Sequence, residues 1–224
     1  MEAVTVACVL RSGGDFTPEW VYALKRGLCR HLSNFQFACL TDIPGIPPVW
    51  RVPLEFGWPG FWAKMELFRP GAFDGPVLYL DLDSLPVGDL SAIASYRGAF
   101  AMITDVWYPD RGAQSAVMAW TPGPVTEAIW ERWIQDPEEH MRRSRGDGEW
   151  LNAHTTPDRL QDLYHGQIVS LKHGPHSGRQ DQPIDGPPEG ARLVVGHGHP
   201  RLSHPSAGWA HDLWKSWARP GPVA

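Results

Sequence analysis

The sequence has 224 residues, of which 42% are hydrophobic and 20% charged, and its net charge is −5. Such a chain can bury the core of one domain, and its mild acidity excludes the basic surface that binds nucleic acid, so we expect no nucleic-acid partner. With no run near the roughly 20 apolar residues of a membrane span and no signal-peptide pattern at its start, we expect a cytoplasmic protein.

The first forty residues predict a strand, a loop, a helix and a second strand. Residues 5–10 are a β-prone run that ends in the turn-rich stretch 11–15. Pro18 suits the first turn of a helix, and apolar residues then recur every three or four positions as far as Leu32. Residues 35–40 predict the next strand. The first loop therefore follows the carboxyl end of a strand, where open α/β sheets bind ligands.

The rest of the chain continues this alternation, which predicts an α/β fold with a mostly parallel central sheet flanked by helices. Its 23 glycines and 22 prolines indicate short elements joined by ordered loops. The strongest strand signal is Val-Leu-Tyr-Leu at 77–80. The other expected elements are strands at 50–52, 99–103, 115–120 and 192–195, and helices at 62–68, 125–134 and 147–153. Cys8 and Cys39 fall inside apolar runs and are expected to be buried free thiols.

An acidic pair, Asp81 and Asp83, follows the strongest strand. A D-x-D tripeptide arises about once by chance in a chain of this length, so its position is what gives it weight. Two carboxylates at one edge of a sheet repel each other in a desolvated site unless a cation lies between them. Mn²⁺ or Mg²⁺ suits this place, since both accept carboxylate, water and phosphate oxygens. The alternative is that Asp83 caps a turn and Asp81 is solvated.

A second polar cluster follows the apolar run at 193–195 and consists of His197, His199 and Arg201, with His204 beyond it. An imidazole can complete the ligand shell of Mn²⁺, and an arginine can bind a phosphate through two nitrogens. We expect His197 to be the metal ligand because the flanking glycines allow a bound group to approach closely. His199 and His204 remain alternatives, and any of these histidines can equally be an ordinary surface residue.

Five segments together resemble GT-A-fold glycosyltransferases, especially the glycogenin-like and bacterial galactosyltransferase group called family 8. The acidic pair with the following Val-Gly-Asp-Leu at 87–90 resembles the family's D-x-D region. Residues 6–15 resemble its first strand and nucleotide-binding loop, and 61–68 resemble the helix that brings a basic residue over the donor. Residues 114–118 resemble its N-x-G-[VM]-[ML] strand, and 197–201 its closing H-G-x-x-K-P element. The likeness runs from about residue 4 to about residue 201.

The sequence departs from the family pattern in several places. Gln114 and Ser115 stand where asparagine and a small residue are usual, and Arg201 replaces the lysine. Gly148 stands where the family has a glutamine near the anomeric carbon. The resemblance implies that the sugar keeps its configuration, and this departure leaves inversion as an alternative. A base, Asp147 or Glu149, would then act, or Asp147 would simply cap the helix that starts there.

The resemblance implies a metal-dependent glycosyltransferase that moves a hexose from a nucleotide-sugar, most simply a UDP-sugar, to an unidentified glycan or small-molecule acceptor. It implies Mn²⁺ or Mg²⁺ on Asp81, Asp83 and His197, and catalytic roles for Gln114, Asp147 and Glu149. The residues expected to contact the nucleotide-sugar are Leu10, Arg11, Gly13, Gly14, Asp15, Thr41, Asp42, Lys64, Asp81, Leu82, Asp105, Ser115 and Arg201.

In this interpretation residues 1–224 form a single GT-A-like (Rossmann-like) domain. Residues 1–90 are its nucleotide-binding half, 91–205 its acceptor and metal-completing half, and 206–224 an aromatic tail. Trp107, Tyr108 and Trp150 are candidates to line the acceptor site, although core packing explains them equally well. No feature of the sequence indicates an oligomeric state.

Two other functions also place D-x-D after an apolar strand. In a haloacid-dehalogenase-type phosphatase one Asp is the nucleophile and the other the acid and base. That motif normally lies on the first strand and is followed by a paired acidic metal site, whereas here 80 residues precede Asp81 and no Asp-Asp pair follows it. The second alternative is a sugar- or nucleotide-binding protein without catalysis, since a fold does not guarantee an activity.

Overall fold

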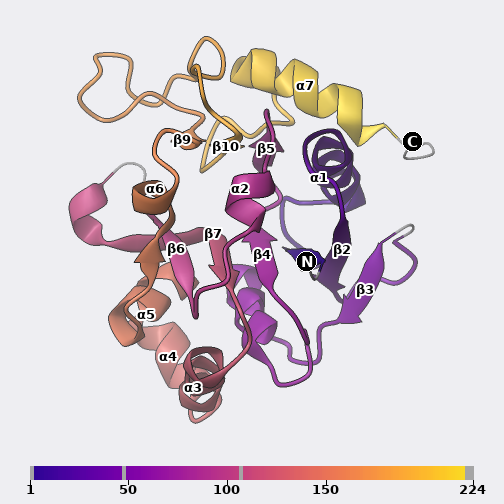
Figure 1. The fold of residues 1–224 in the computed structure, drawn as a ribbon, viewed down its shortest axis with the longest axis vertical. Helices are drawn as coiled ribbons and strands as arrows, with labels where there is room; N and C mark the ends of the chain where they lie inside the picture. Colours follow the sequence, from indigo (N-terminus) through magenta and orange to yellow (C-terminus); the bar gives the residue numbers. More distant parts are fainter. Residues whose placement is uncertain (1–2, 47–48, 106–107, 220–224) are drawn as a thin grey trace.

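The structure, a computed structural model, describes residues 3–46, 49–105 and 108–219 (Figure 1). The strands of its main sheet are β1 (Val4–Leu10), β2 (Phe35–Thr41), β3 (Trp50–Pro53), β4 (Val77–Leu80), β6 (Ala101–Thr104), β7 (Ala113–Trp120) and β8 (Asp158–Arg159). The α-helices are α1 (Pro18–His31), α2 (Ser91–Ala94), α3 (Pro124–Trp133), α4 (Pro137–Arg143), α5 (Asp147–His154), α6 (Leu160–Leu163) and α7 (Trp209–Ala218). The 3-10 helices are η1 (Gly60–Phe68), η2 (Pro109–Arg111) and η3 (Pro205–Ala207).

The main sheet has seven strands in the order β3-β2-β1-β4-β7-β6-β8. The strands from β3 to β4 pair in parallel, β7 runs antiparallel to both β4 and β6, and β8 is parallel to β6. The predicted α/β fold with a mostly parallel sheet is therefore confirmed. Because β7 is antiparallel, its first residues lie at the same edge of the sheet as the last residues of β1 and β4.

The predicted unit of strand, helix and strand at the start of the chain is confirmed as β1, α1 and β2. The two strands pair in register from Val4 with Phe35 to Leu10 with Thr41. Alternate side chains of β1 enter different cores: Cys8 and Leu10 pack in the cluster that includes α1, and Ala7 packs in the cluster on the other face. The predicted buried thiols of Cys8 and Cys39 are free and buried.

A smaller sheet in the order β5-β10-β9 brings distant parts of the chain together, from β5 (Ser84–Pro86), β10 (Leu193–Val195) and β9 (Ile168–Ser170). All three strands have three residues, and the sequence indicated only β10, whose residues are all apolar and end at a glycine; β5 and β9 mix apolar residues with serine or proline. β5 directly follows the acidic pair, and the amide of Gly196 donates to the carbonyl of Asp83 at 2.9 Å. The pairing of β5 with β10 therefore places the segment that begins at Gly196 and contains His197 and His199 next to the acidic pair.

The aromatic tail, for which the sequence indicated no regular element, forms α7. Trp217 of this helix is buried against α1, where a Cβ atom on Gly27 would lie 2.8 Å from the indole. The Arg26 side chain donates to the carbonyls of Trp217 and Arg219 at the end of α7. α1 and α7 thus lie together, away from α3, α4 and α5 (Figure 1). Within the part of the chain that the structure describes, no helix is long and apolar enough to cross a membrane.

Candidate active site

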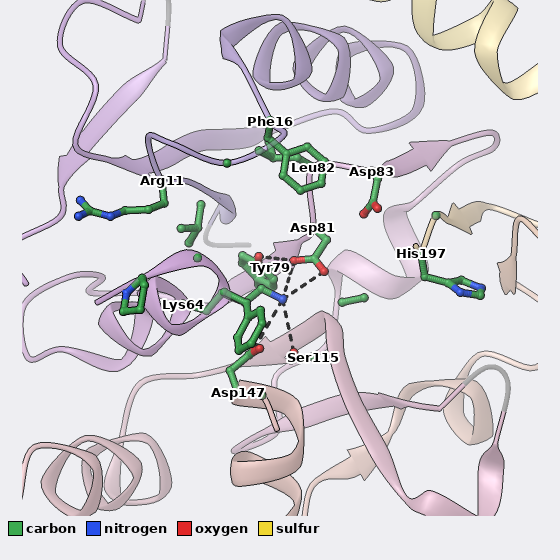
Figure 2. A pocket seen from close by; sticks show the side chains of 18 of the residues that line it. Arg11, Phe16, Lys64, Tyr79, Asp81, Leu82, Asp83, Ser115, Asp147 and His197 are labelled. Atoms are coloured by element: carbon green, nitrogen blue, oxygen red, sulfur yellow. Dashed lines mark hydrogen bonds and ion pairs between the residues drawn. The ribbon is translucent and has the colours of Figure 1, made fainter. Parts of the chain in front are cut away.

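A pocket of 620 Å³ opens at the carboxyl ends of β1 and β4 (Figure 2). Its walls come from the loop after β1, from η1 and the segment before it, from the end of β4 with the residues that follow, from the start of β7, from the start of α5, and from residues 196–201. The residues predicted from sequence that line it are Arg11, Gly13, Gly14, Lys64, Asp81, Leu82, Asp83, Gln114, Ser115, Asp147, His197 and Arg201.

Lys64 lies at the centre of a group of polar and charged side chains in this pocket. Its Nζ lies 2.8 Å from Asp81 Oδ1, 3.6 Å from Asp147 Oδ2 and 3.4 Å from Ser115 Oγ (Figure 2). Burial by itself lowers the pKa of the ammonium group, but the charges of Asp147 and Asp81 outweigh it and raise the pKa. The side chain therefore stays positive and joins two acids that come from different elements.

Asp83 is the most deeply buried of the predicted metal ligands. Burial, followed by the charge of Asp81, raises its pKa to about 7, although Arg201 and Lys64 oppose the rise. Arg201 donates to Asp83 Oδ2 at 3.3 Å and also pairs with Asp15 at 3.2 Å. The cations of the protein therefore compensate this acidic cluster only in part, and an added positive charge would stabilise it.

Asp147 is buried at the first turn of α5, which packs against β7. Burial raises the pKa of its carboxyl group and Lys64 opposes that rise. Gly146, and not Asp147, is the N-cap residue of α5. The capping role considered from the sequence is thus wrong, and the Asp147 side chain is directed to the pocket (Figure 2).

The two carboxylates that follow β4 suit a hard divalent ion, and His197 does not reach them in this conformation. The His197 ring is turned away from Asp81 and Asp83 (Figure 2), and its Nε2 lies 2.8 Å from Ser170 Oγ. Burial, followed by the charge of Lys172, lowers the pKa of His197 to about 4, so the imidazole is neutral, as a metal ligand must be. Among residues 3–46, 49–105 and 108–219, no three His, Cys, Asp or Glu side chains are gathered to hold a metal.

Six predicted residues lie outside the lining of the pocket: Leu10, Asp15, Thr41, Asp42, Asp105 and Glu149. Leu10 and Thr41 are completely buried in their strands. Asp42 supports the loop after β1 instead, since it binds the Arg11 side chain at 2.6 Å and the Ser12 amide at 2.8 Å.

Asp15, Asp105 and Glu149 each bind another residue of the protein. Asp15 pairs with Arg201, as described above, and Asp105 accepts the amide of Tyr108 at 2.8 Å. Glu149 is exposed and binds Arg145 through the side chain and the backbone amide. A role for Glu149 as a base gains no support from this position.

Three aromatic residues of the pocket, Phe16, Phe61 and Tyr79, were not predicted as site residues. The hydroxyl of Tyr79 donates to Asp81 Oδ1, because residues two apart on a strand face the same side of the sheet. The two-residue spacing of Tyr79 and Asp81 could therefore have indicated this contact from the sequence. Phe16 lies 5.0 Å below the guanidinium of Arg201, a cation–π contact between opposite ends of the chain that no local pattern signals.

The position of Gly148 bears on the wall of the pocket at the start of β7. A Cβ atom there would lie 3.1 Å from Ser115 Oγ and 3.2 Å from Ser115 N, so a glutamine would require β7 to shift. The amide side chain that does line the pocket is Gln114. Of the aromatic acceptor candidates, Trp150 is buried in the core, Tyr108 is exposed outside the pocket lining, and Trp107 falls outside the described residues.

No protein-family model matches the sequence, and no curated protein matches it significantly. Solved structures do match its fold. The glycosyltransferase GlyE of Streptococcus pneumoniae TIGR4 superimposes with a TM-score of 0.71 at 17% identity over 99% of this chain, which spans 61% of the GlyE chain. An active-site mutant of LgtC superimposes with a TM-score of 0.64 at 12% identity, over 97% of both chains.

A second LgtC structure, the galactosyltransferase in complex with donor and acceptor sugar analogues, gives a TM-score of 0.58 at 12% identity. The match again covers 97% of each chain. Over nearly its whole length, the chain therefore has the GT-A-like α/β fold of the family 8-like glycosyltransferases GlyE and LgtC.

Proposed function

We propose that the protein is a glycosyltransferase that moves a hexose from a UDP-sugar to a glycan or small-molecule acceptor. One observation carries this proposal: Asp81, Asp83 and Asp147 converge with Lys64 and Arg201 in one pocket at the carboxyl ends of β1 and β4. Acids beside cations at this edge suit a diphosphate with its counter-ion. The fold shared with GlyE and LgtC supports the same function.

The loop after β1 would receive the nucleoside. Gly13 has a φ of +83°, which a residue with a side chain rarely adopts, and a Cβ atom on Gly13 or Gly14 would meet no neighbour within 4 Å. The backbone there leaves room for a base or ribose to approach. Residues 1–90 would thus supply the nucleotide-binding half, and residues 91–205 would complete the site from the acceptor side.

The diphosphate would lie between Lys64 and Arg201, whose charges favour the departing UDP. Asp81 and Asp83 would hold Mn²⁺ or Mg²⁺, and His197 would join them as the third ligand once its ring turns from Ser170 toward the acids. A divalent ion supplies positive charge to the leaving diphosphate when it is bound. Lys64, held by Asp81 and Asp147, would keep its proton and direct its N–H groups at the phosphates.

The sugar and the acceptor would be oriented by Gln114, Ser115 and Asp147. These three residues line one side of the pocket at the starts of β7 and α5. Asp147 would accept a hydrogen bond from a sugar hydroxyl, and Gln114 supplies an amide beside Gly148, where the family pattern has its glutamine. We propose retention of configuration at the anomeric carbon on this basis, with Asp147 as the base if the reaction inverts.

UDP release from UDP-glucose and UDP-galactose with Mn²⁺ tests the function, because glycosyltransferases commonly transfer slowly to water. The proposal expects UDP release that EDTA stops. Hydrolysis of p-nitrophenyl phosphate in preference to the UDP-sugars would indicate the phosphatase. Binding of UDP without turnover on any donor would indicate a binding protein.

The variant Asp83→Ala tests the acidic pair. We expect it to lower metal-dependent UDP release by at least about 100-fold, the order of effect of removing a group that stabilises the departing charge. Circular dichroism should be unchanged, since the removed carboxylate is itself costly to bury. Asp89→Ala is the matched control: Asp89 lies outside the pocket and bonds to Ser91. Full activity of the Asp83 variant would refute the assignment.

A further inference from the structure

A buried carboxylate on η1 holds the segment that leads into the pocket. The Glu66 side chain is completely buried. Its Oε2 accepts the amide N–H of Glu55 at 2.7 Å, and its Oε1 accepts that of Phe56 at 3.0 Å. A carboxylate that accepts two consecutive backbone amides fixes both their positions and their directions. The residues just beyond Phe56 that line the pocket are Gly57, Pro59, Gly60 and Phe61.

Other contacts fasten the same segment on either side of Glu66. Arg69 binds the side chain of Glu55 and donates to the carbonyl of Pro53 at 3.3 Å. The ring of Phe56 stacks on Trp58 with the ring centroids 4.4 Å apart. Arg11, at the end of β1, faces Glu66 as a positive charge and favours its ionised form. The segment at 53–60 is therefore tied to η1 at several points, with Glu66 at the centre.

This arrangement costs free energy when Glu66 is charged. Burial raises its pKa to about 7, although the amide of Phe56 and the charge of Arg11 oppose the rise. An uncharged side chain of similar size would avoid this cost. In the charged form both oxygens can accept hydrogen bonds from the backbone amides. A protonated carboxyl group or a carboxamide carries a donor at one of its two ends, so only the other end is free to accept.

We propose that Glu66 is a positioning residue for donor binding: it orders residues 54–60 and through them the pocket wall beside Lys64. Lys64 precedes it by two positions on the same short helix, so one element presents a cation to the pocket and anchors the neighbouring wall. The identity of the ligand as a UDP-sugar rests on the proposed function. The ordering of the segment does not.

Amide hydrogen exchange tests the ordering without any ligand. At pH 8, Glu66→Gln should speed exchange of the amides of Glu55 and Phe56 by about tenfold, the effect of losing one buried hydrogen bond. Glu131→Gln is the matched control, since it makes the same change at an exposed glutamate outside this segment and leaves both bonds to Glu66 in place. Equal exchange in wild type and Glu66→Gln would overturn the proposal.

Calorimetric titration with UDP and Mn²⁺ tests the link to the pocket. We expect Glu66→Gln to bind UDP at least about fivefold more weakly, a loss near that of one hydrogen bond. For UDP-sugar hydrolysis KM should rise while kcat changes little, and Glu66→Asp, which keeps the charge, should recover part of the affinity. Unchanged UDP affinity in Glu66→Gln would overturn the role in donor binding. If wild type fails to bind UDP, the proposed function fails, and hydrogen exchange still decides the ordering role.

The pH dependence separates positioning from general stability. Because the pKa of Glu66 is higher in the folded protein, this residue contributes stability at pH values below about 4.3, its pKa in the unfolded chain. The contribution is lost as the pH rises through about 7, its pKa in the folded protein. At pH 8 the thermal midpoint of Glu66→Gln should therefore equal or exceed that of wild type, while its loop exchanges faster. Near pH 5, where wild-type Glu66 is protonated, the difference in exchange should shrink. A midpoint that falls by more than about 4 °C at pH 8 would indicate a purely structural role and overturn the proposal.

Discussion

At the scale of single residues, three acids and three cations line the pocket, and two of the cations, Lys64 and Arg201, each pair with two acids. Lys64 joins Asp81 to Asp147, and Arg201 joins Asp83 to Asp15. The compensation is incomplete at Asp83, whose pKa is raised to about 7 first by burial and then by Asp81. A site that tolerates partly compensated acids is suited to bind positive charge or to share protons with a ligand.

The variant Lys64→Met tests this coupling. It leaves the carboxylates of Asp81 and Asp147 without their shared cation, and we expect a loss of about 1–3 kcal/mol in the free energy of unfolding. Urea denaturation at pH 7.5 measures it. Asp147→Asn in the Lys64→Met background should recover part of the loss, because it removes one unpaired buried charge. Additive effects of the two changes would show that Lys64 and Asp147 are not coupled.

At the scale of elements, the small sheet is what completes the pocket. β10 pairs with β5 directly after the acidic pair, and the next residue, Gly196, lies against the backbone of Asp83. The chain therefore turns from β10 into residues 196–201 at a fixed point beside the acids. Lys172, which is buried after β9, donates to the carbonyl of His199 at 2.7 Å and supports the same turn.

Gly196→Ala tests this close approach. A Cβ atom at that position would lie 2.7 Å from the carbonyl oxygen of Asp83, which is backbone and cannot swing aside. We expect about 1–3 kcal/mol of destabilisation from the overlap and a shift of residues 196–201 that weakens UDP binding. Urea denaturation and calorimetry measure the two effects. Gly186→Ala serves as the control, since nothing lies within 4 Å of a Cβ atom there and its backbone is not left-handed. Wild-type stability and UDP affinity in Gly196→Ala would contradict the close contact between Gly196 and Asp83.

At the scale of the whole molecule, stability and site are supported by different parts of the chain. α7 contributes no residue to the pocket lining, yet its Trp217 is buried against α1. The pocket is built from segments between residues 9 and 201, which meet only because the large and small sheets share the turn between β4 and β5. The tail therefore packs on the first α/β unit without lining the pocket.

Trp217→Ala should lower the free energy of unfolding by about 3–5 kcal/mol, the cost of truncating a buried tryptophan. UDP affinity at 20 °C should stay within about twofold of wild type if the variant remains folded, since additivity holds for distant sites. Trp50→Ala is the control, because 47% of Trp50 is exposed. A large loss of UDP affinity in a folded Trp217 variant would show that α7 reaches the site.

The sequence by itself determined the α/β fold, its first α/β unit and the strand that leads into Asp81. Each of these follows from a local signal: the apolar period of a helix or a strand, a proline in a first turn, and polar residues placed directly after an apolar run. The same signals placed Asp83 at the carboxyl edge of the sheet, where ligands of open α/β folds bind. Lys64, Gln114 and Asp147 were named from the resemblance to family 8, and no local period indicated them.

Only the tertiary structure decided which of the polar residues share the pocket. The short strands β5 and β9 gain their order from pairing with β10, and three residues carry too little local information to predict that pairing. The turned ring of His197, the exposed place of Glu149 and the burial of Glu66 depend on contacts between residues far apart in the chain. Such contacts are set by packing and charge in three dimensions, and no period along the sequence encodes them.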